Sequence, residues 1–283
     1  MSHAIIIPIY CENRNTINLC NELQNFGAEH IVVVNDGLNP KSEYFNELTS
    51  IGCHLVHLKN NNGKGASLKA GIKYAHDNLY NITGYITCDA DGQHTANDVM
   101  KISRMLDLRN GSLILGKRDY KKSKMPLNIR IGNRLSSAYF KVITGKSCRD
   151  TQTGLRGIPA FLYDTVMKTK GSRFDFEMNF LTKCADMRVP FYFVNIIADC
   201  SNCSSNFRLI KDTYLIYRTP LRFATASIGC TIIDLVLFTI FAYILPSHMF
   251  FNIMLATLMA RVVSGGINFL INRKVIFGNT DNG

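Results

Sequence analysis

Two aspartates, Asp89 and Asp91, follow a short apolar run in the stretch "YITCDADGQH". Carboxylates two residues apart at a strand end can face one divalent cation, and Mg²⁺ accepts one or two carboxylates while substrate phosphates fill its other positions. The alternative is a solvated polar turn that caps the strand, and D-x-D alone would favour that alternative. Gln93 and His94 follow at once, and both favour a metal over a plain turn. Together these residues favour a metal site made by Asp89, Asp91 and Gln93.

Lys64 lies between two glycines in "NNNGKGASLKAGIKYA", where a helix is expected to begin. Backbone N–H groups and a lysine at a helix start suit a phosphate. The spacing differs from that of a Walker loop, so this is not a P-loop. An ordinary helix start with a solvated lysine is the alternative.

Basic residues are concentrated in two segments of a chain whose formal net charge is +11. Residues 117–134 contain seven Lys or Arg residues, among them Arg118, Arg130 and Arg134, and one acid. The second cluster begins at Arg208 and leads into an apolar region, as is typical of a membrane surface. Tyr120 is the only aromatic residue between 117 and 134, which argues against nucleic acid as a partner.

Short apolar runs alternate with stretches of helical spacing through the first 200 residues. This alternation predicts a parallel sheet covered on both faces, in which ligands bind beyond the carboxyl ends of the strands. Glu12, Asp36 and Asp89 each follow such a run, so we expect one shared cleft. The runs are 4–10, 30–36, 53–58, 84–90, 112–118 and 189–198, and the helical stretches are 16–26, 66–78 and 174–187.

Residues 224–245 and 250–271 are two apolar stretches of 22 residues. Each is long enough to span a hydrocarbon core of about 30 Å. Basic residues flank both, which predicts a multi-pass protein of the inner (plasma) membrane with a cytoplasmic catalytic domain. Asp234 and Arg261 lie near the middle of their stretches, and we expect them to pair with each other across the hairpin or between subunits.

The segment 206–223 carries apolar residues at roughly helical spacing among basic ones, so it should lie in the membrane interface as an amphipathic helix. The predicted domains are therefore a catalytic domain at 1–205, a juxtamembrane helix at 206–223 and a two-helix membrane hairpin at 224–283. Nine cysteines, including a single C-x-x-C at Cys200 and Cys203, favour free thiols in a reducing compartment over disulfides or zinc.

Eight motifs occur in an order typical of one enzyme family: "IPIYCENRN", "VVVNDGLN", "NNGKGASLKAG", "TCDADGQH", "GKRD", "NRLSSAYFKVITG", "DTQTGLRGIP" and "FDFEMNFL". Through them residues 1–220 resemble family 2 glycosyltransferases of the polyprenyl-phosphate (dolichyl-phosphate mannose synthase-like) type. The segments "FATASIGCTIIDLVLF" and "NFLINRKVIF" resemble the first half of the GtrA-type membrane family, which has four helices where this chain has two.

The resemblance implies an α/β GT-A fold with a mostly parallel sheet, an interfacial helix and two transmembrane helices. It implies an inverting enzyme of cell-envelope glycan modification, which moves a hexose from a nucleotide diphosphate sugar, UDP-sugar being favoured, to polyprenyl (undecaprenyl) phosphate at the cytoplasmic face. GDP-mannose is the alternative donor. The cofactor would be Mg²⁺ or Mn²⁺. A homo-oligomer and a separate flippase remain open.

The resemblance also assigns residues by role. Asp91, Asp150 and Glu177 would lie at the reacting sugar, Asp150 as an orienting group. Asp89, Asp91 and Gln93 would hold the metal, and Arg118, Arg130, Arg134 and Arg208 the acceptor phosphate. The nucleotide sugar would contact Pro8, Tyr10, Glu12, Asn35, Asp36, Lys64, Asp89, Ala90 and Gln93.

One departure from the family pattern is Asn35-Asp36-Gly37-Leu38, where D-D-G-S is usual. It is the only support for a non-catalytic lipid carrier or scaffold with a degenerate domain. A nucleotidyltransferase would share the α/β fold and the metal carboxylates, but it needs no membrane anchor.

Overall fold

The computed structural model describes residues 2–118, 127–173, 175–197, 209–245 and 250–271. The chain divides into two compact units, Met1–Phe207 and Arg208–Gly283.

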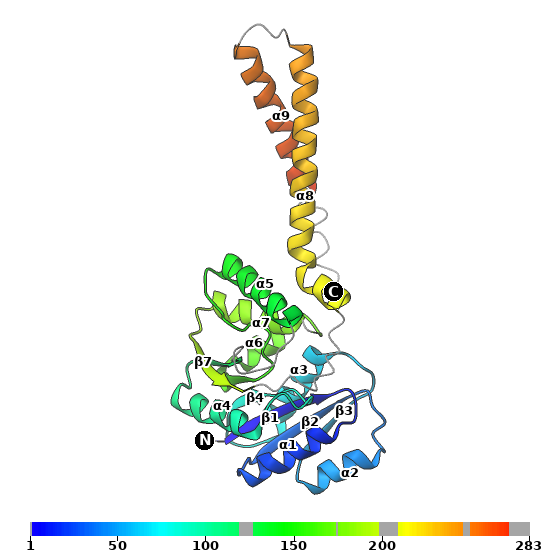
Figure 1. Cartoon of the computed structure of the whole chain (residues 1–283), viewed down its shortest axis with the longest axis vertical. Coiled ribbons are helices and arrows are strands. Elements are labelled where there is room, and N and C mark those ends of the chain that lie inside the picture. Colours follow the sequence, from blue (N-terminus) through cyan, green and yellow to red (C-terminus); the bar gives the residue numbers. More distant parts are fainter. Residues whose placement is uncertain (1, 119–126, 174, 198–208, 246–249, 272–283) are drawn as a thin grey trace. The chain divides into compact units, whose positions relative to one another are not determined.

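The first unit is built on a seven-stranded sheet with the order β3-β2-β1-β4-β6-β5-β7 (Figure 1). β1 to β4 pair in parallel, β5 pairs with β7 in parallel, and β6 is antiparallel to both of its neighbours. The mostly parallel sheet and the six predicted strands are therefore confirmed. β6 was not predicted, because its four residues form no apolar run. The strands are β1 (Ser2–Ile9), β2 (His30–Asp36), β3 (His54–Leu58), β4 (Ile82–Thr87), β5 (Leu113–Arg118), β6 (Arg156–Pro159) and β7 (Phe191–Ile196).

Helices cover both faces of this sheet, which explains why the strands are apolar without interruption. In β1, Ile5 and Ile7 point into one core, whereas Ala4 and Ile6 point into the other. The first core is closed by α1 (Arg14–Asn25), α2 (Glu43–Ser50) and α4 (Ala96–Leu108); the second contains side chains of α3 (Lys64–Asn78), α5 (Leu127–Thr144), α6 (Tyr163–Lys168) and α7 (Asp175–Asp186).

The second unit contains α8 (Leu209–Ile244) and α9 (Phe250–Ile271). Within the described residues, Ser227–Ile244 is the stretch long and apolar enough to cross a membrane. The second predicted span forms helix α9, but its role in a membrane stays a prediction. The helix α8 runs through the predicted boundary between residues 223 and 224, and the division into a juxtamembrane helix and a membrane hairpin stays a prediction.

The expected pair of Asp234 and Arg261 is not formed within the chain. Asp234 Oδ1 instead accepts a hydrogen bond from Ser264 Oγ of α9 at 2.7 Å, and Arg261 is exposed. Sequence position gives the depth of a residue along a helix. The rotation of each helix about its axis, which decides the partner, comes from packing.

Candidate active site

The loop after β4 carries Asp89 and Asp91, and the start of α1 holds it in place. Thr16 Oγ1 donates to the carbonyl of Ala90 at 3.1 Å, and Asn15 Nδ2 donates to that of Asp91 at 3.5 Å. Gly92 adopts φ +85°, and a Cβ there would meet the Asn15 side chain at 2.7 Å. The tight turn and its neighbours therefore fix where the two carboxylates lie.

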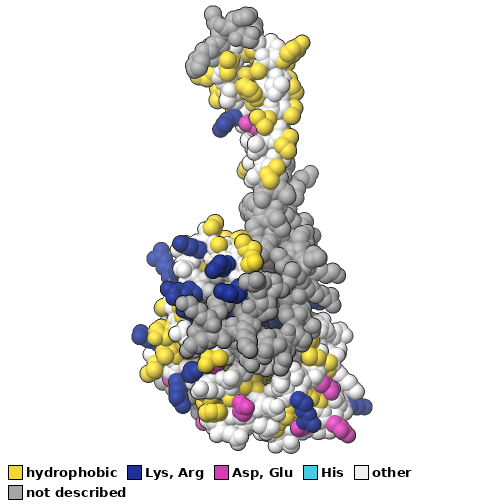
Figure 2. All heavy atoms as spheres, in the orientation of Figure 1, with side chains coloured by type: hydrophobic (Ala, Val, Ile, Leu, Met, Phe, Trp, Pro, Cys, Tyr) yellow, Lys and Arg dark blue, Asp and Glu magenta, His cyan; other side chains and the backbone are white. Residues whose placement is uncertain are grey.

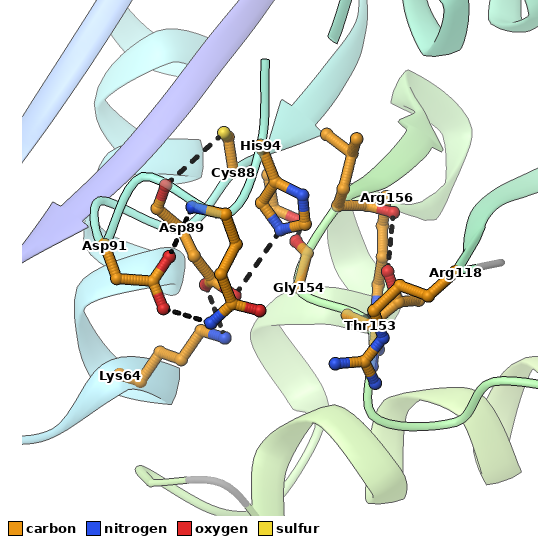
Figure 3. Close-up of polar contacts among 12 residues, drawn as sticks. Lys64, Cys88, Asp89, Asp91, His94, Arg118, Thr153, Gly154 and Arg156 are labelled. Carbon is orange, nitrogen blue, oxygen red and sulfur yellow. Dashed lines mark hydrogen bonds and ion pairs between the residues drawn. The ribbon is translucent and has the colours of Figure 1, made fainter. Parts of the chain in front are cut away.

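Asp89 is one corner of a partly buried charge cluster formed by three elements. Figure 3 shows Asp89 with Lys64 and His94 beside it. Lys64 Nζ, at the start of α3, lies 2.7 Å from Asp89 Oδ1 and 3.1 Å from Glu177 Oε1, in the first turn of α7. Burial disfavours the charges of Lys64 and Asp89, but the attraction between them, and that of Glu177 for Lys64, outweighs it: the pKa of Lys64 lies above its usual value and the pKa of Asp89 well below it. The predicted residues Lys64, Asp89 and Glu177 are thus brought together.

Asp91 lies beside this cluster in a different electrostatic state. Its carboxylate accepts hydrogen bonds from the backbone N–H and the side-chain amide of Gln93. Burial, and then the negative charge of Asp89, raise the pKa of Asp91. Amide N–H groups therefore stabilise the negative charge of Asp91, whereas the charge of Lys64 balances that of Asp89.

These residues fit a divalent cation. Mg²⁺ and Mn²⁺ sites in phosphate-transfer enzymes use one or two carboxylates and take further oxygens from the substrate. Asp91 and Asp89 supply two carboxylates in one loop, and the charge of Asp91 has no ion-pair partner among the described residues. The described residues contain no group of three or more His, Cys, Asp or Glu that could hold a metal by themselves, so phosphate oxygens would have to complete the shell.

Two site residues, Gly154 and His94, were not assigned from the sequence. A Cβ on Gly154 would lie 2.0 Å from Asp89 Oδ2, so only glycine lets the loop before β6 approach this carboxylate. His94 is buried, and its Nε2 lies 3.7 Å from Asp89 Oδ2. Its position directly after D-x-D was the one sequence signal available.

Asp36, predicted to contact the nucleoside, organises the loop in front of Lys64. Its two oxygens accept the backbone N–H groups of Asn62 and Gly63 at 2.8 and 2.9 Å. Asn35 is buried, and its side chain hydrogen-bonds both backbone groups of Leu38 and the ring of His57. The departure from D-D-G-S therefore builds a turn, and neither of these side chains depends on a bound base for its contacts.

At the end of β5, Arg118 and Asp150 form a buried bidentate ion pair. Nε and one terminal nitrogen of Arg118 each lie 2.7 Å from an oxygen of Asp150, which is fully buried. Arg156, missed from the sequence, donates to the carbonyls of Thr151, Thr153 and Glu177. It thereby ties the loop that follows Asp150 to the start of α7.

The other predicted site residues occupy varied environments. Pro8 is buried within β1, while Tyr10 and Glu12 are exposed after it. The part of the Tyr10 ring that is buried, together with the neighbouring Cys11, raises the pKa of Tyr10 to about 12. Arg130 and Arg134 are exposed on one side of α5. Arg208, like Cys200 and Cys203, lies outside the described residues.

Comparison with known proteins decides the family. Residues 4–165 match the model of glycosyl transferase family 2, more than half of the chain. The chain belongs to glycosyl transferase family 2. An uncharacterized protein of Methanocaldococcus jannaschii is 32% identical over 188 residues, which cover 62% of this chain and 73% of that protein.

Two further proteins are similar to this family 2 glycosyltransferase. A UDP-N-acetylglucosamine–dolichyl-phosphate N-acetylglucosaminyltransferase of Methanococcus voltae is 30% identical, covering 54% of this chain and 67% of that protein. The structure of glucosyl-3-phosphoglycerate synthase from Mycobacterium tuberculosis with Mn²⁺, UDP-glucose and phosphoglyceric acid shares the fold, with a TM-score of 0.56, 11% identity and coverage of 78% and 77%. The protein is a glycosyltransferase with a GT-A fold.

Proposed function

We propose that this glycosyltransferase moves a hexose-type sugar from a UDP-sugar to a polyprenyl phosphate at a membrane surface. The observation that carries the proposal is the charge cluster at the carboxyl edge of the sheet, in which Asp91 lies beside the Lys64–Asp89–Glu177 network. The cluster places a carboxylate that can bind a cation beside a lysine at a helix start that can bind phosphate, and a sugar diphosphate needs both. The similarity to the dolichyl-phosphate transferase of Methanococcus voltae supports the donor and acceptor classes.

On the donor side, Asp91 and Asp89 would hold Mg²⁺ or Mn²⁺ with the diphosphate. When bound, such an ion acts as a Lewis acid toward the charge that develops on the leaving diphosphate. Lys64 lies at the start of α3, where backbone N–H groups also favour an anion. Glu177 and Asp89 keep this lysine charged and in place. Asp36 supports the donor site from behind by ordering residues 62 and 63.

On the acceptor side, Arg118, Arg130 and Arg134 supply guanidinium groups, which suit phosphate oxygens. Asp150 uses two of the five N–H groups of Arg118 and sets the orientation of this guanidinium. The apolar stretch Ser227–Ile244 would keep the protein at the bilayer that contains the lipid acceptor.

The reaction is a single in-line displacement. An oxygen of the acceptor phosphate attacks the anomeric carbon, the bond from that carbon to the nucleoside diphosphate breaks, and the configuration inverts. A phosphate monoester has a second pKa of about 6, so its oxygen is already ionised at cytosolic pH. Asp150, which is buried and paired with Arg118, therefore serves as a positioning residue, and no strong base is needed.

A panel of donors tests the proposal. Full-length protein in membranes is incubated with radiolabelled UDP-glucose, UDP-N-acetylglucosamine or GDP-mannose and undecaprenyl phosphate, with and without Mn²⁺. We expect label in the organic phase with a UDP-sugar, dependent on metal. Transfer only from GDP-mannose would replace the donor assignment. Transfer only to a soluble acceptor, such as phosphoglycerate, would reject the lipid acceptor.

The substitution Asp91→Asn tests the metal-binding carboxylate. It keeps the hydrogen-bonding shape but removes the charge, so we expect lipid-linked product to fall by about 100-fold or more with unchanged protein yield. The matched control is Asp77→Asn, which removes an exposed carboxylate from a surface pair with Lys73. Equal activity of the two variants at saturating metal would contradict the assignment.

A further inference from the structure

The outer side of α5 combines exposed apolar residues with basic ones. Ile131, Leu135 and Val142 are 56%, 59% and 85% exposed, and Ala138 between them is exposed too. Their spacing of four, three and four residues places them on one stripe of the helix. We call this stripe, with its flanking basic residues, the α5 outer face. Several large apolar side chains in a row on a surface mark an interaction site.

The charges of this face all have one sign. Arg130, Arg134 and Lys141 repeat at nearly the same spacing beside the apolar stripe, and all three are exposed. Residues 127–149 contain five Lys or Arg residues and no Asp or Glu. The next acid, Asp150, is buried in its pair with Arg118. Figure 2 shows Lys and Arg side chains gathered over this part of the first unit, with hydrophobic side chains near them.

The opposite side of α5 anchors the helix to the active-site loop. Asn133 donates to the carbonyl of Arg149 and accepts the backbone N–H of Thr151, both at 3.2 Å. Ser136 Oγ accepts a hydrogen bond from the side chain of Gln152 at 3.1 Å, and Phe140 is fully buried. These contacts fix α5 to the loop that contains Asp150, so a partner bound to the outer face of α5 would also hold this loop in place.

The positive charge of the α5 outer face indicates which kind of partner can bind there. A second copy would bring another α5 with the same positive charges. The amphipathic segment 206–223 of this chain also carries four basic residues and one acid, so it would be repelled as well. A surface of anionic lipid offers negative charge for the basic residues and acyl chains for the apolar stripe.

We propose that the α5 outer face docks onto the headgroup region of an anionic lipid bilayer. Ile131, Leu135 and Val142 enter the boundary between headgroups and acyl chains, while Lys141 contacts lipid phosphates and Arg130 and Arg134 add positive charge to the same face. This contact is a second attachment of the protein to the bilayer, independent of α8, and it holds the Asp150 loop at the lipid surface. The inference does not depend on which sugar or acceptor is used.

The chain contains no tryptophan, so one introduced tryptophan reports its own surroundings. Full-length Val142→Trp is reconstituted in vesicles of phosphatidylcholine and phosphatidylglycerol whose acyl chains carry bromine, which quenches tryptophan on contact. Tyr80→Trp is the matched control, because Tyr80 is 88% exposed and lies between α3 and β4, at the amino end of the sheet strands. We expect blue-shifted, strongly quenched emission at 142 and unshifted, weakly quenched emission at 80. Ile131→Trp repeats the measurement should the first variant fold poorly.

A charge reversal completes the experiment. Lys141→Glu in the Val142→Trp background should reduce the quenching severalfold, and so should vesicles without phosphatidylglycerol. Lys73→Glu, an exposed change on α3, should leave it unchanged. Equal quenching at 142 and 80 would overturn the proposal. A blue shift without bromine quenching would overturn it in favour of a protein partner. If neither Lys141→Glu nor the omission of phosphatidylglycerol reduced the quenching, anionic lipid would not be what the face recognises.

Discussion

Gly154 is the residue at which the smallest chemical change should disturb the charge cluster most. An added methyl group would lie 2.0 Å from Asp89 Oδ2, so the carboxylate would have to move, which would disturb its ion pair with Lys64. Misplacing a reacting or binding group by about 1 Å can cost about 100-fold in rate. We expect Gly154→Ala to lower kcat/KM for the donor sugar by roughly that factor, measured with the lipid-transfer assay.

Gly111→Ala is the matched control for this substitution, because a Cβ at Gly111 would meet nothing within 4 Å. We expect near-normal activity from that variant. Normal activity of Gly154→Ala would mean that Asp89 need not hold this position during transfer.

At the scale of elements, His3 joins β1 to α4. A hydrogen bond of 2.8 Å joins its ring to Ser103 Oγ, and the ring lies 3.4 Å from an oxygen of Asp107. Burial lowers the pKa of His3, and Asp107 only partly opposes this effect. A lowered pKa in the folded state means that the unfolded chain binds the proton more readily. The buried, uncharged ring therefore contributes fully to stability above the unfolded pKa of about 6.5, and this contribution is lost as the pH falls from there through the lowered pKa.

The substitution His3→Gln should make the free energy of unfolding less sensitive to this acid range. Thermal unfolding of the wild type and the variant at about pH 7.5 and about pH 5.5 measures the effect. We expect a smaller drop for the variant between the two conditions. An identical drop would assign the acid sensitivity to other groups.

The packing of α8 against α9 depends in part on the hydrogen bond from Ser264 to Asp234. Hydrogen bonds between helices in membranes contribute about 0.6 kcal/mol on average and up to about 1.7 kcal/mol. Ser264→Ala should lower the stability of the helix pair by about that range in micelles, whereas Asp234→Asn keeps an acceptor oxygen and should lower it less.

Thr257→Ala is the control for the helix pair, because the Thr257 hydroxyl bonds to the carbonyl of Ile253 within α9. We expect this variant to unfold like the wild type. A Ser264→Ala variant as stable as Thr257→Ala would show that the Asp234 contact contributes nothing to the pairing.

At the scale of the molecule, the described polar residues of the candidate site all belong to the first unit, and the apolar stretch Ser227–Ile244 belongs to the second. A chain of residues 1–207 should therefore still bind UDP with Mn²⁺, measured by calorimetry. Its transfer of sugar to undecaprenyl phosphate in vesicles should fall about tenfold or more, because the apolar helix no longer concentrates the enzyme at the bilayer. Full transfer by the short chain would show that the second unit is dispensable for catalysis.

Much of the site's location could be read from the sequence. Strands buried on both faces leave continuous apolar runs, and the carboxyl ends of parallel strands lie at one edge, so Asp36 and Asp89 were expected to share it. A glycine-flanked lysine at a helix start was likewise visible as a candidate. Such patterns are local, and a few neighbouring residues suffice to show them.

Other features depend on which segments meet, and only the tertiary structure decided them. Glu177 reaches Lys64 across more than a hundred residues of chain, Gly154 is required by a carboxylate of another loop, and β6 is a strand because β4 and β5 flank it. Asp234 accepts a hydrogen bond from Ser264 in place of the expected ion pair with Arg261. Sequence spacing predicts the face and depth of a residue, but the partner is chosen by the packing of distant elements, which no local pattern encodes.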